Sequence, residues 1–382
     1  MDKPQKGVGT QALYTQLIAH LRERILDGRL PPGARLPTEM ELARELQISR
    51  GTVRQALGAL ESEGLLDRTQ RRGTFVRRAP EAVAPAPQAA ERRIGLVLSH
   101  VGNQLTLDIL IGVESAAKSR GYQVSFAYSE ERVEEQSRDI ARLQADRVAG
   151  MIIFPISDVT FDESIAQLHA GGMPLVLIDR YLPDLDTDYV VADNTGGGYR
   201  ATEHLIILGH TRVGFVYGSL SGLRTTSVRD RHAGYRQAIE TYGLHYDESL
   251  VYQMPWGHVP SGEAHYDAFV ARPNRPVAIF AVNDDIALQL MRAAQRCGVR
   301  VPEDLALVGF DDLTVSAHLN PPLTTVSQPR MDIGLRAGNL LINRIEGQGG
   351  PTKQIELPTS LIVRASCGAR RLAQRAPQVR ES

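Results

Sequence analysis

The stretch "ISRGTVRQALGALESEGLL", residues 48–66, decides the fold of the N-terminal part of the chain. Its apolar residues Val53, Leu57 and Leu60 recur at helical spacing, which predicts an amphipathic helix with one buried stripe. The start of this helix carries only donors and small residues, and no acid: Ser49, Arg50, Gly51, Thr52 and Arg54. A helix N-terminus of this composition favours a polyanion as its partner, because the helix dipole is positive at that end.

The residues on either side of this stretch predict two more helices and a hairpin. The first helix is expected over Thr10 to Asp27. The second begins in "LPTEMELARELQ", where Thr38 and Glu41 have the spacing of a capping box. Ile48 and Ser49 separate it from the third helix, which Gly64 ends. Two strand-like runs, "LLDRTQ" and "GTFVRR", follow around Arg71-Arg72-Gly73.

Helix, helix, short turn, helix and hairpin together predict an α+β winged helix-turn-helix domain over residues 8–78. Such a domain places its last helix in the major groove of B-DNA, where Arg50 and Arg54 can donate to guanine or phosphate. Ser49 and Thr52 suit phosphate oxygens, and Gly51 removes bulk where the helix approaches the duplex. The alternative is a solvated basic face that contacts nothing. The residues expected at the DNA are Thr38, Ser49, Arg50, Gly51, Thr52, Arg54, Arg71, Arg72, Gly73 and Thr74.

The charge of the chain is divided unequally between its two parts. Residues 1–79 hold 14 Lys and Arg against 9 Asp and Glu, a balance of +5. Residues 80–382 hold the other 29 Lys and Arg against 35 Asp and Glu, a balance of −6, so the net charge of the chain is −1. A basic head on an acidic body predicts that double-stranded DNA is a partner of the head alone.

The segment "APEAVAPAPQAAE", residues 79–91, predicts a semi-extended linker between two domains. Beyond it, short apolar runs such as "IGLVLS", "GMIIFP", "PLVLID", "VAIFAV" and "LALVGF" alternate with stretches of helical period. This alternation predicts parallel sheets covered on both faces, which is an α/β fold. Residues 92–368 are enough for two lobes rather than one open sheet, and residues 369–382 form a polar tail.

Polar residues follow several of these expected strands. Asp179 and Arg180 follow "PLVLI", Asn283 follows "AIFAV" and Asp311 follows "LALVGF". Ligands of open α/β sheets bind beyond the carboxyl ends of the strands, and acids, amides and guanidinium groups suit a polyhydroxylated ligand. Two more residues are expected at the same edge: Arg231, opening a helix, and Gln328, at a crossing between the lobes.

Each of these residues has a structural alternative. Asp311 or Asp193 could cap a helix, Asn283 could be a turn residue, and Arg231 could form a surface ion pair. The run Gly196–Gly198 could cradle a phosphate or, more often at such a position, allow close packing of a helix start. Trp256 could stack on a ligand or pack in a core.

Several function classes are disfavoured. Two cysteines, Cys297 and Cys367, are too few for a disulfide framework, and the histidines show no metal-ligand spacing, so no metal or cofactor is expected. The chain has no GxSxG, P-loop or HExxH motif, and we expect no enzyme. It has neither an apolar leader nor a long apolar stretch, which predicts a cytoplasmic protein without a membrane partner.

The head resembles the DNA-binding domain of GntR-type repressors. "LPPGARLPTEMELARELQISRGTVRQALGALESEGLL" and "RRGTFV" carry the resemblance over about 70 residues. It implies DNA contacts from the positions of Ser49, Arg50, Gly51, Thr52, Arg54 and Gly73. Many members have a DNA-contacting arginine at the position of Met40, and its loss suggests that this head depends more on its third helix and wing. Some GntR-type heads are fused to pyridoxal-phosphate enzymes, but none of the four lysines of this chain suits that cofactor.

The body resembles the effector domains of LacI-type repressors and the ribose-binding proteins. "VADNTGGGYRATEHLIILGHTRVGFVYG", "RDRHAGYRQAI", "AIFAVNDDIAL" and "VPEDLALVGFDD" carry this resemblance. It implies a two-lobed domain of the periplasmic-binding-protein type, with further contacts from "VGNQLTLDI". The effector cleft would be lined by Asp179, Arg180, Arg231, Asn283, Asp311 and Gln328.

A GntR-type head on a LacI-type body is similar to the arabinose repressor family. That similarity implies a repressor that binds operator DNA as a homodimer and responds to a small-molecule effector, such as a pentose. A nucleoside or purine effector is the alternative within this class, because purine-binding repressors share the body. A solute receptor is the alternative outside it.

Overall fold

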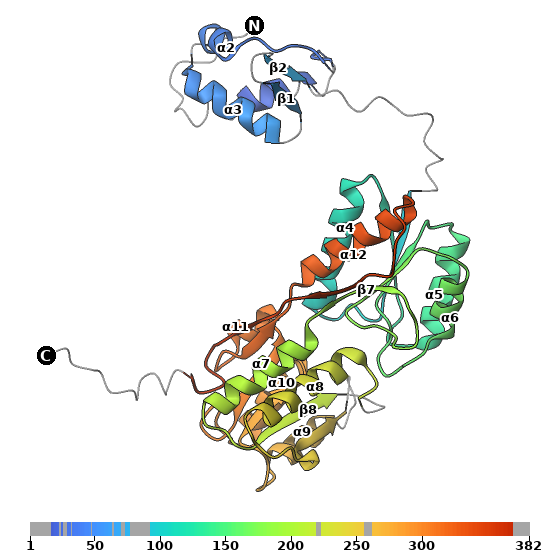
Figure 1. Cartoon of the computed structure of the whole chain (residues 1–382). Helices are drawn as coiled ribbons and strands as arrows, with labels where there is room; N and C mark the ends of the chain where they lie inside the picture. The colour runs from blue at the N-terminus through green and yellow to red at the C-terminus, as the bar shows by residue number, and fades with distance from the viewer. Residues whose placement is uncertain are drawn as a thin grey trace, which may run out of the picture. The chain divides into compact units, whose positions relative to one another are not determined.

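The computed structural model describes residues 17–22, 24–25, 29–31, 33–46, 48–62, 65–69, 73–76, 92–218, 223–255 and 262–369. The chain divides into two compact units, Met1–Pro87 and Gln88–Ser382. The expected linker, residues 79–91, lies outside the described residues, as do Gly64, Arg71, Arg72, Trp256 and residues 370–382 of the tail. Figure 1 labels helices and strands of both units.

The first unit has the helices and the hairpin that the sequence predicts. Residues 17–22 and 24–25 are helical. Helices α2 (Glu39–Leu46) and α3 (Arg50–Ser62) follow, and strands β1 (Leu66–Thr69) and β2 (Gly73–Val76) pair antiparallel. The predicted stripe of Val53, Leu57 and Leu60 is fully buried. It packs with Leu17, Leu21, Leu36, Leu42, Leu66 and Val76, so the winged helix-turn-helix fold is confirmed.

The first lobe of the second unit is built on a six-stranded sheet in the order β13-β7-β6-β5-β3-β4, with every strand pair parallel. Its strands are β3 (Arg93–Leu98), β4 (Gln123–Tyr128), β5 (Met151–Ile153), β6 (Leu175–Ile178), β7 (Asp188–Ala192) and β13 (Gln354–Leu357). Its helices are α4 (Gln104–Ser119), α5 (Val133–Ala145), α6 (Glu163–Ala170) and α12 (Arg330–Ile345). We call this part lobe 1.

Lobe 2 repeats the plan with the strand order β14-β12-β11-β10-β8-β9, in which only β14 runs antiparallel to its neighbour. Its strands are β8 (Val213–Gly218), β9 (Val251–Met254), β10 (Ala278–Ala281), β11 (Ala306–Asp311), β12 (Thr324–Ser327) and β14 (Ser360–Ile362). Its helices are α7 (Asn194–Ile207), α8 (Thr226–Thr241), α9 (Gly262–Val270), α10 (Asp284–Arg296) and α11 (Thr314–His318), with a short 3-10 turn at Glu248–Leu250.

Both faces of the lobe 1 sheet are buried, because alternate residues of each strand enter two different cores. On β5, Ile152 packs with residues of α4 and α12, whereas Met151 and Ile153 pack with residues of α5 and α6. This explains why the strands read as continuous apolar runs rather than as alternating ones.

The chain crosses between the lobes three times. It leaves β7 of lobe 1 for α7 of lobe 2, returns from β12 to α12, and passes finally from β13 to β14. Neither lobe is therefore a continuous segment of the sequence.

Each crossing helix packs on the helix that follows the first strand of the lobe that it enters, through glycines that allow close contact of the two backbones. A Cβ on Gly112 of α4 would lie 2.1 Å from the carbonyl oxygen of Met331 in α12, and one on Gly234 of α8 would lie 1.9 Å from that of Thr195 in α7. Gly334 and Gly198 repeat the relation in the other direction, at 2.1 Å and 2.2 Å. The α4/α12 and α7/α8 pairs are thus equivalent, and Gly198 is explained by close packing rather than by a phosphate.

The expected start of one helix of the body needs correction. Helix α8 begins at Thr226, so Arg231 lies in its second turn and does not open it. Thr225, a residue type that favours the N-cap, occupies that position, although its side chain makes no capping hydrogen bond. Asn283 is not a simple turn residue: its side chain accepts from the Ile286 amide and caps α10. Among the described residues, no helix is long and apolar enough to span a membrane.

Candidate functional site: a nucleic-acid interface and a ligand cleft

The two arginines at the start of α3 are exposed and share one carboxylate. Arg50 Nε and Arg54 Nη2 each lie 3.2 Å from Oε2 of Glu39, a residue of α2 that is itself mostly buried. The sequence around α3 contains no acid near these arginines, and the fold supplies one from the preceding helix. Glu39 therefore holds the two guanidinium groups next to one another on one face of the head, and sequence reasoning missed it.

The hydroxyl groups expected at the DNA make hydrogen bonds at the N-termini of α2 and α3. The Thr52 amide donates to Ser49 Oγ at 3.0 Å, and the two hydroxyl groups lie 2.8 Å apart. Thr38 and Glu41 form the predicted capping box, in which the Thr38 amide donates to Glu41 at 2.8 Å and the Glu41 amide to Thr38 at 3.3 Å. The Thr38 amide and hydroxyl group lower the pKa of Glu41.

The two glycines of this surface differ in their structural role. A Cβ on Gly51 would meet only Ser49 Oγ, at an ordinary 3.6 Å, so the packing of the head does not require glycine there. Gly73 has a φ of +111°, which favours glycine, and begins β2 beside the half-buried Thr74. Met40, at the position of the family's arginine, is 61% exposed on the neighbouring helix.

In the second unit, loops that follow strands of both lobes line one cavity. Five of the six residues predicted for the effector cleft border it, namely Asp179, Arg180, Arg231, Asn283 and Asp311. The cavity is also lined by His100, Asn103, Leu105, Phe154, Ser157, Asp158, Gly218, Thr225, Ser227, Val228 and Val282. The strand ends of the two lobes therefore bring together side chains that are far apart in the sequence.

Arg231 and Asp311 form the buried centre of the lobe 2 wall. Arg231 Nη2 lies 3.6 Å from Asp311 Oδ1, while its Nε donates to Asn194 Oδ1 at 2.9 Å and its Nη1 to the Val282 carbonyl at 2.8 Å. The guanidinium group lies 3.7 Å from the centre of the Phe310 ring. Burial raises the pKa of Asp311 well above its usual value, and Arg231 opposes that shift.

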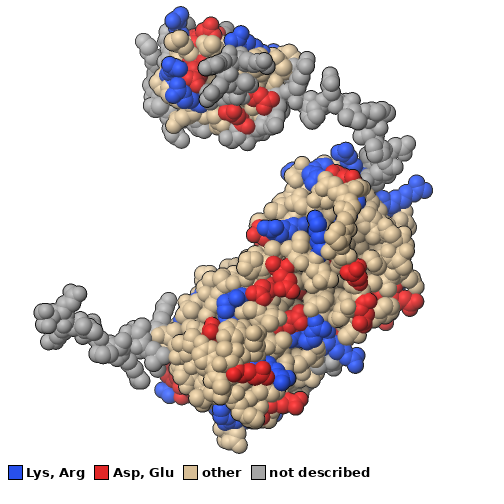
Figure 2. Space-filling view, in the orientation of Figure 1, with Lys and Arg blue, Asp and Glu red and all other residues tan. Residues whose placement is uncertain are grey.

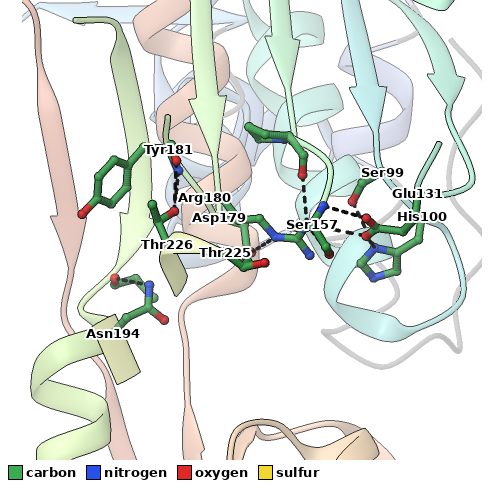
Figure 3. Close-up of polar contacts among 12 residues, drawn as sticks. Ser99, His100, Glu131, Ser157, Asp179, Arg180, Tyr181, Asn194, Thr225 and Thr226 are labelled. Atoms are coloured by element: carbon green, nitrogen blue, oxygen red, sulfur yellow. Dashed lines mark hydrogen bonds and ion pairs between the residues drawn. The ribbon is translucent and has the colours of Figure 1, made fainter. Parts of the chain in front are cut away.

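Arg180 occupies the lobe 1 wall and is surrounded by acceptors (Figure 3). Its Nη1 donates to the Pro155 carbonyl at 3.0 Å and to Ser157 Oγ at 2.7 Å, and lies 3.5 Å from Glu131 Oε1. Glu131 also accepts from the Ser157 amide at 2.7 Å and lies 3.4 Å from His100 Nδ1. Although burial opposes it, Arg180 with His100 and the Ser157 amide lowers the pKa of Glu131 to about 2.

The sixth predicted cleft residue, Gln328, does not line the cavity. It follows β12 at a crossing between the lobes, as expected, and its Nε2 donates to Asp311 Oδ1 at 2.7 Å. Gln328 is therefore placed to orient Asp311. The φ of Asp311 is +113° and that of Asp179 is +62°, so both carboxylates sit on strained backbone at the edge of the cleft.

Hydrogen bonds join the two lobes beside the cavity (Figure 3). The Asp158 amide donates to Thr225 Oγ1 at 2.9 Å. The Tyr181 amide donates to Thr226 Oγ1, and Thr226 Oγ1 donates back to the Tyr181 carbonyl, both at 3.0 Å. The Tyr181 hydroxyl group donates to Asp230 of α8 at 3.1 Å. The lobes are thus in contact across the mouth of the cleft.

Sequence reasoning missed about half of this lining. His100 follows β3, Ser157 and Asp158 follow β5, and Thr225 precedes α8. The rule that located Asp179 and Asp311 applies equally to His100 and Ser157. Thr225 stands at the N-cap of α8, and its residue type was a signal that could have located it. Nothing local marks Glu131, which lies in the loop after β4.

A winged helix-turn-helix head joined to a two-lobed domain with a polar cleft defines the class of DNA-binding transcriptional regulators. Comparison with known families agrees. Residues 13–76 match the model of bacterial regulatory proteins of the gntR family, and residues 202–367 match that of the periplasmic binding protein-like domain. The chain belongs to the family of transcriptional repressors that combine these two domains.

Relatives match over most of their length. The arabinose metabolism transcriptional repressor of Geobacillus stearothermophilus is 31% identical over 344 residues, which cover 87% of this chain and 91% of that protein. The regulator CelR of Thermobifida fusca is 31% identical over 348 residues, which cover 87% of this chain and 98% of that protein. Among solved structures, a CelR–cellobiose complex superposes with a TM-score of 0.65 at 29% identity, covering 87% of this chain and 100% of that one.

Proposed function

We propose that this repressor binds operator DNA as a homodimer and that a small uncharged polyol, a sugar, controls the binding from the cleft between its lobes. The exposed Arg50 and Arg54, with Ser49, Gly51 and the wing around Gly73, would face the duplex. Thr38, Thr52 and Thr74 would support that surface, because each is engaged in the caps or the strand of the head.

One observation carries the choice of ligand. Two polar atoms of cavity-lining residues are buried without a hydrogen bond among the described residues: Asn103 Oδ1, and Arg180 Nε, whose nearest charged partner is Asp179 Oδ2 at 3.6 Å. One is an acceptor and the other a donor, and an unsatisfied buried polar group costs about 1–3 kcal/mol. Hydroxyl groups of a bound polyol both donate and accept, so they can satisfy the two atoms together.

The charges of the cleft favour a ligand without a net charge. Arg231 faces Asp311, and Arg180 faces both Asp179, at 3.6 Å, and Glu131. These groups already neutralise one another, so a phosphate or a carboxylate would find no unpaired arginine here. A nucleoside is the second candidate, because Phe154 on the wall offers a ring face, although Arg180 already lies over that ring at 4.7 Å.

A thermal-shift screen of free sugars, sugar phosphates and nucleosides tests this proposal, since a ligand that binds the native state raises the unfolding temperature. We expect stabilisation by at least one neutral sugar, such as a pentose, and by none of the sugar phosphates. The purified protein should leave the sugar chemically unchanged. Stabilisation by a nucleoside alone would overturn the choice of ligand.

Operator binding is tested separately by fluorescence anisotropy. Arg50→Ala should weaken operator binding and reduce the slope of log K against log salt concentration by about 1, the value for one lost phosphate contact. The control is Arg236→Ala, which removes an exposed arginine of similar pairing from the body. Equal affinities of Arg50→Ala and the unmodified protein would refute the placement of α3 on DNA.

A further inference from the structure

One end of lobe 1 carries a local excess of positive charge. The summed charge of residues 80–382 is −6, and this sum assigns DNA to the head alone. It hides the local distribution: Figure 2 shows Lys and Arg side chains gathered at the end of lobe 1 where α12 ends, whereas both signs are mixed over lobe 2. We call five basic residues at this end the basic edge, namely Arg92, Arg93, Lys118, Arg120 and Arg147.

The start of β3 brings the basic edge together. Its neighbours in the sheet are β4 and β5, which follow the turns after α4 and α5. The Gln123 amide donates to the Arg92 carbonyl at 2.9 Å, and the Ala149 amide donates to the Arg93 carbonyl at 2.7 Å. Arg92 Nη1 lies 3.1 Å from the point that a Cβ on Gly121 would occupy. Both turns therefore lie against the residues at which β3 begins.

Most cations of the basic edge have no acidic partner among the described residues. Four of the five form no ion pair there: Arg92, Arg93, Lys118 and Arg147. The fifth, Arg120, pairs with Glu346, which follows α12. Asp146 is the single acid in the turns after α4 and α5. Five cations against these two acids leave the edge with a net charge of +3.

The helix dipole offers a structural explanation for these cations. Helices α4 and α5 end here, and a Lys or Arg beside a negative helix C-terminus is stabilising. Lobe 2 tests that explanation, because α8 and α9 precede the two strands that flank β8 in the same way. Its matching segments are balanced: residues 211–212, 240–250 and 271–277 hold three arginines and three acids, whereas residues 92–93, 118–122 and 146–150 hold five cations and one acid. The helix ends therefore do not require the excess in lobe 1.

One position shows the contrast directly. Gly112 of α4 and Gly234 of α8 are equivalent, because a Cβ on each would lie 2.1 Å and 1.9 Å from a backbone oxygen of its partner helix. Six residues further along, Lys118 in α4 stands where α8 has Glu240, and both lie in the last turn of their helix. The same helix end thus accepts either sign of charge, so packing does not dictate a cation in lobe 1.

We propose that the basic edge binds the phosphate backbone of the duplex next to the site that the head reads. The proposal rests on the proposed function, which places the head on DNA. Fifteen residues separate Val76, the end of β2, from Arg92. Fully extended, a segment of this length spans at most about 55 Å, which corresponds to roughly 16 base pairs of B-DNA. The chain therefore keeps the basic edge within reach of the phosphates that flank the head.

Phosphate is the partner that the charge of this edge fits. Duplex DNA carries one negative charge per about 1.7 Å of its axis, so several phosphates can face the cations at once. The two helix C-termini would repel a polyanion without these cations, which reverse the sign of the edge. The body as a whole is acidic, so its other surfaces are repelled by DNA. Phosphate contacts carry no sequence information, so the edge adds affinity rather than specificity.

Fluorescence anisotropy of the full chain on a random-sequence duplex of several helical turns tests the proposal, since phosphate contacts do not depend on sequence. The test variant carries Arg92→Ala and Arg147→Ala. Its slope of log K against log salt concentration should fall by about 2, which makes the loss of affinity between about 50 and 200 mM salt about tenfold smaller. The control carries Arg212→Ala and Arg272→Ala, which remove two exposed arginines from the matching segments of lobe 2. Its slope should equal that of the unmodified chain.

The outcomes separate this proposal from the proposed function. A double variant that matches the control overturns the basic edge, and a reduced slope for Arg50→Ala in the same assay would leave the head on DNA. A reduced slope for the double variant beside an unchanged Arg50→Ala supports the edge and refutes the placement of α3. An unmodified chain that binds no duplex overturns both. Lys118→Glu is the second variant, which the equivalent Glu240 shows to be compatible with this helix end, and it should also weaken binding and lower the slope.

Discussion

Replacing Arg231 with alanine removes the group on which the lobe 2 wall of the cleft is built. The change deletes two hydrogen bonds, at 2.9 and 2.8 Å, the ion pair to Asp311 and the contact with the Phe310 ring. It also leaves Asp311 as a buried carboxylate without its cation. Loss of one partner of a buried pair costs about 3–5 kcal/mol. For a domain of this size, each kcal/mol shifts the unfolding temperature by about 2–4 °C, so a decrease on the order of 10 °C is expected.

Calorimetry of the full chain measures this decrease, and titration with the sugar should show no binding. The control is Arg236→Ala, on the same helix, whose pair with Glu240 is exposed to solvent and contributes little to stability. Adding Asp311→Asn to Arg231→Ala should restore part of the lost stability, because it removes the unpaired carboxylate. An Arg231→Ala protein within about 1 kcal/mol of the unmodified chain would refute the reasoning.

Three further changes have definite expected results. Glu39→Gln should strengthen non-specific DNA binding in anisotropy titrations, because it removes the carboxylate beside Arg50 and Arg54; weaker binding to every duplex would instead mean that Glu39 must orient both arginines. Glu131→Gln should lower stability at pH 7 by on the order of 3 kcal/mol. The pKa of Glu131 is lowered from 4.5 to about 2, so its stabilising effect is complete above pH 4.5 and is lost as the pH falls through about 2. The difference in chemical denaturation between the two proteins should disappear over that range, and a constant difference would contradict the ion pair with Arg180. Deleting residues 1–78 should leave a folded body that binds the sugar, and loss of that binding would contradict the domain boundary.

The elements of the fold follow from the sequence wherever burial is complete. The runs that form β5, β6 and β10 are apolar along their whole length, and those of β3 and β11 are apolar except for the terminal Arg93 and Asp311, as a strand covered on both faces requires. Strand β13 reads "QIEL", an alternation of polar and apolar residues only four residues long, and β14 has three residues, so neither is long enough to be distinguished as a strand. Their pairing depends on the chain crossing between lobes, which is a long-range property.

The site residues that directly follow a strand could be predicted from the sequence. The residues that hold an arginine from another element in place could not. Asp179, Asn283 and Asp311 follow apolar runs directly. Glu39 and Glu131 meet their arginines only because separate elements pack together, 11 and 49 residues away in the sequence. Periodicity and turn signals are local, so they contain no information on such pairs.

The crossings between the lobes impose an order on synthesis. Lobe 1 starts at β3, but its sheet lacks β13 and one face lacks α12 until residue 357 has been made. By then the chain has supplied all of lobe 2 except β14. During synthesis on a ribosome, lobe 1 is therefore started first but completed after most of lobe 2. Its core residues Ile152 and Val176 stay unpacked on one side until Ile333, Ala337 and Leu341 of α12 have been synthesised. A chain stopped before α12 therefore exposes the apolar sheet of lobe 1, and such a fragment is expected to aggregate or to be degraded.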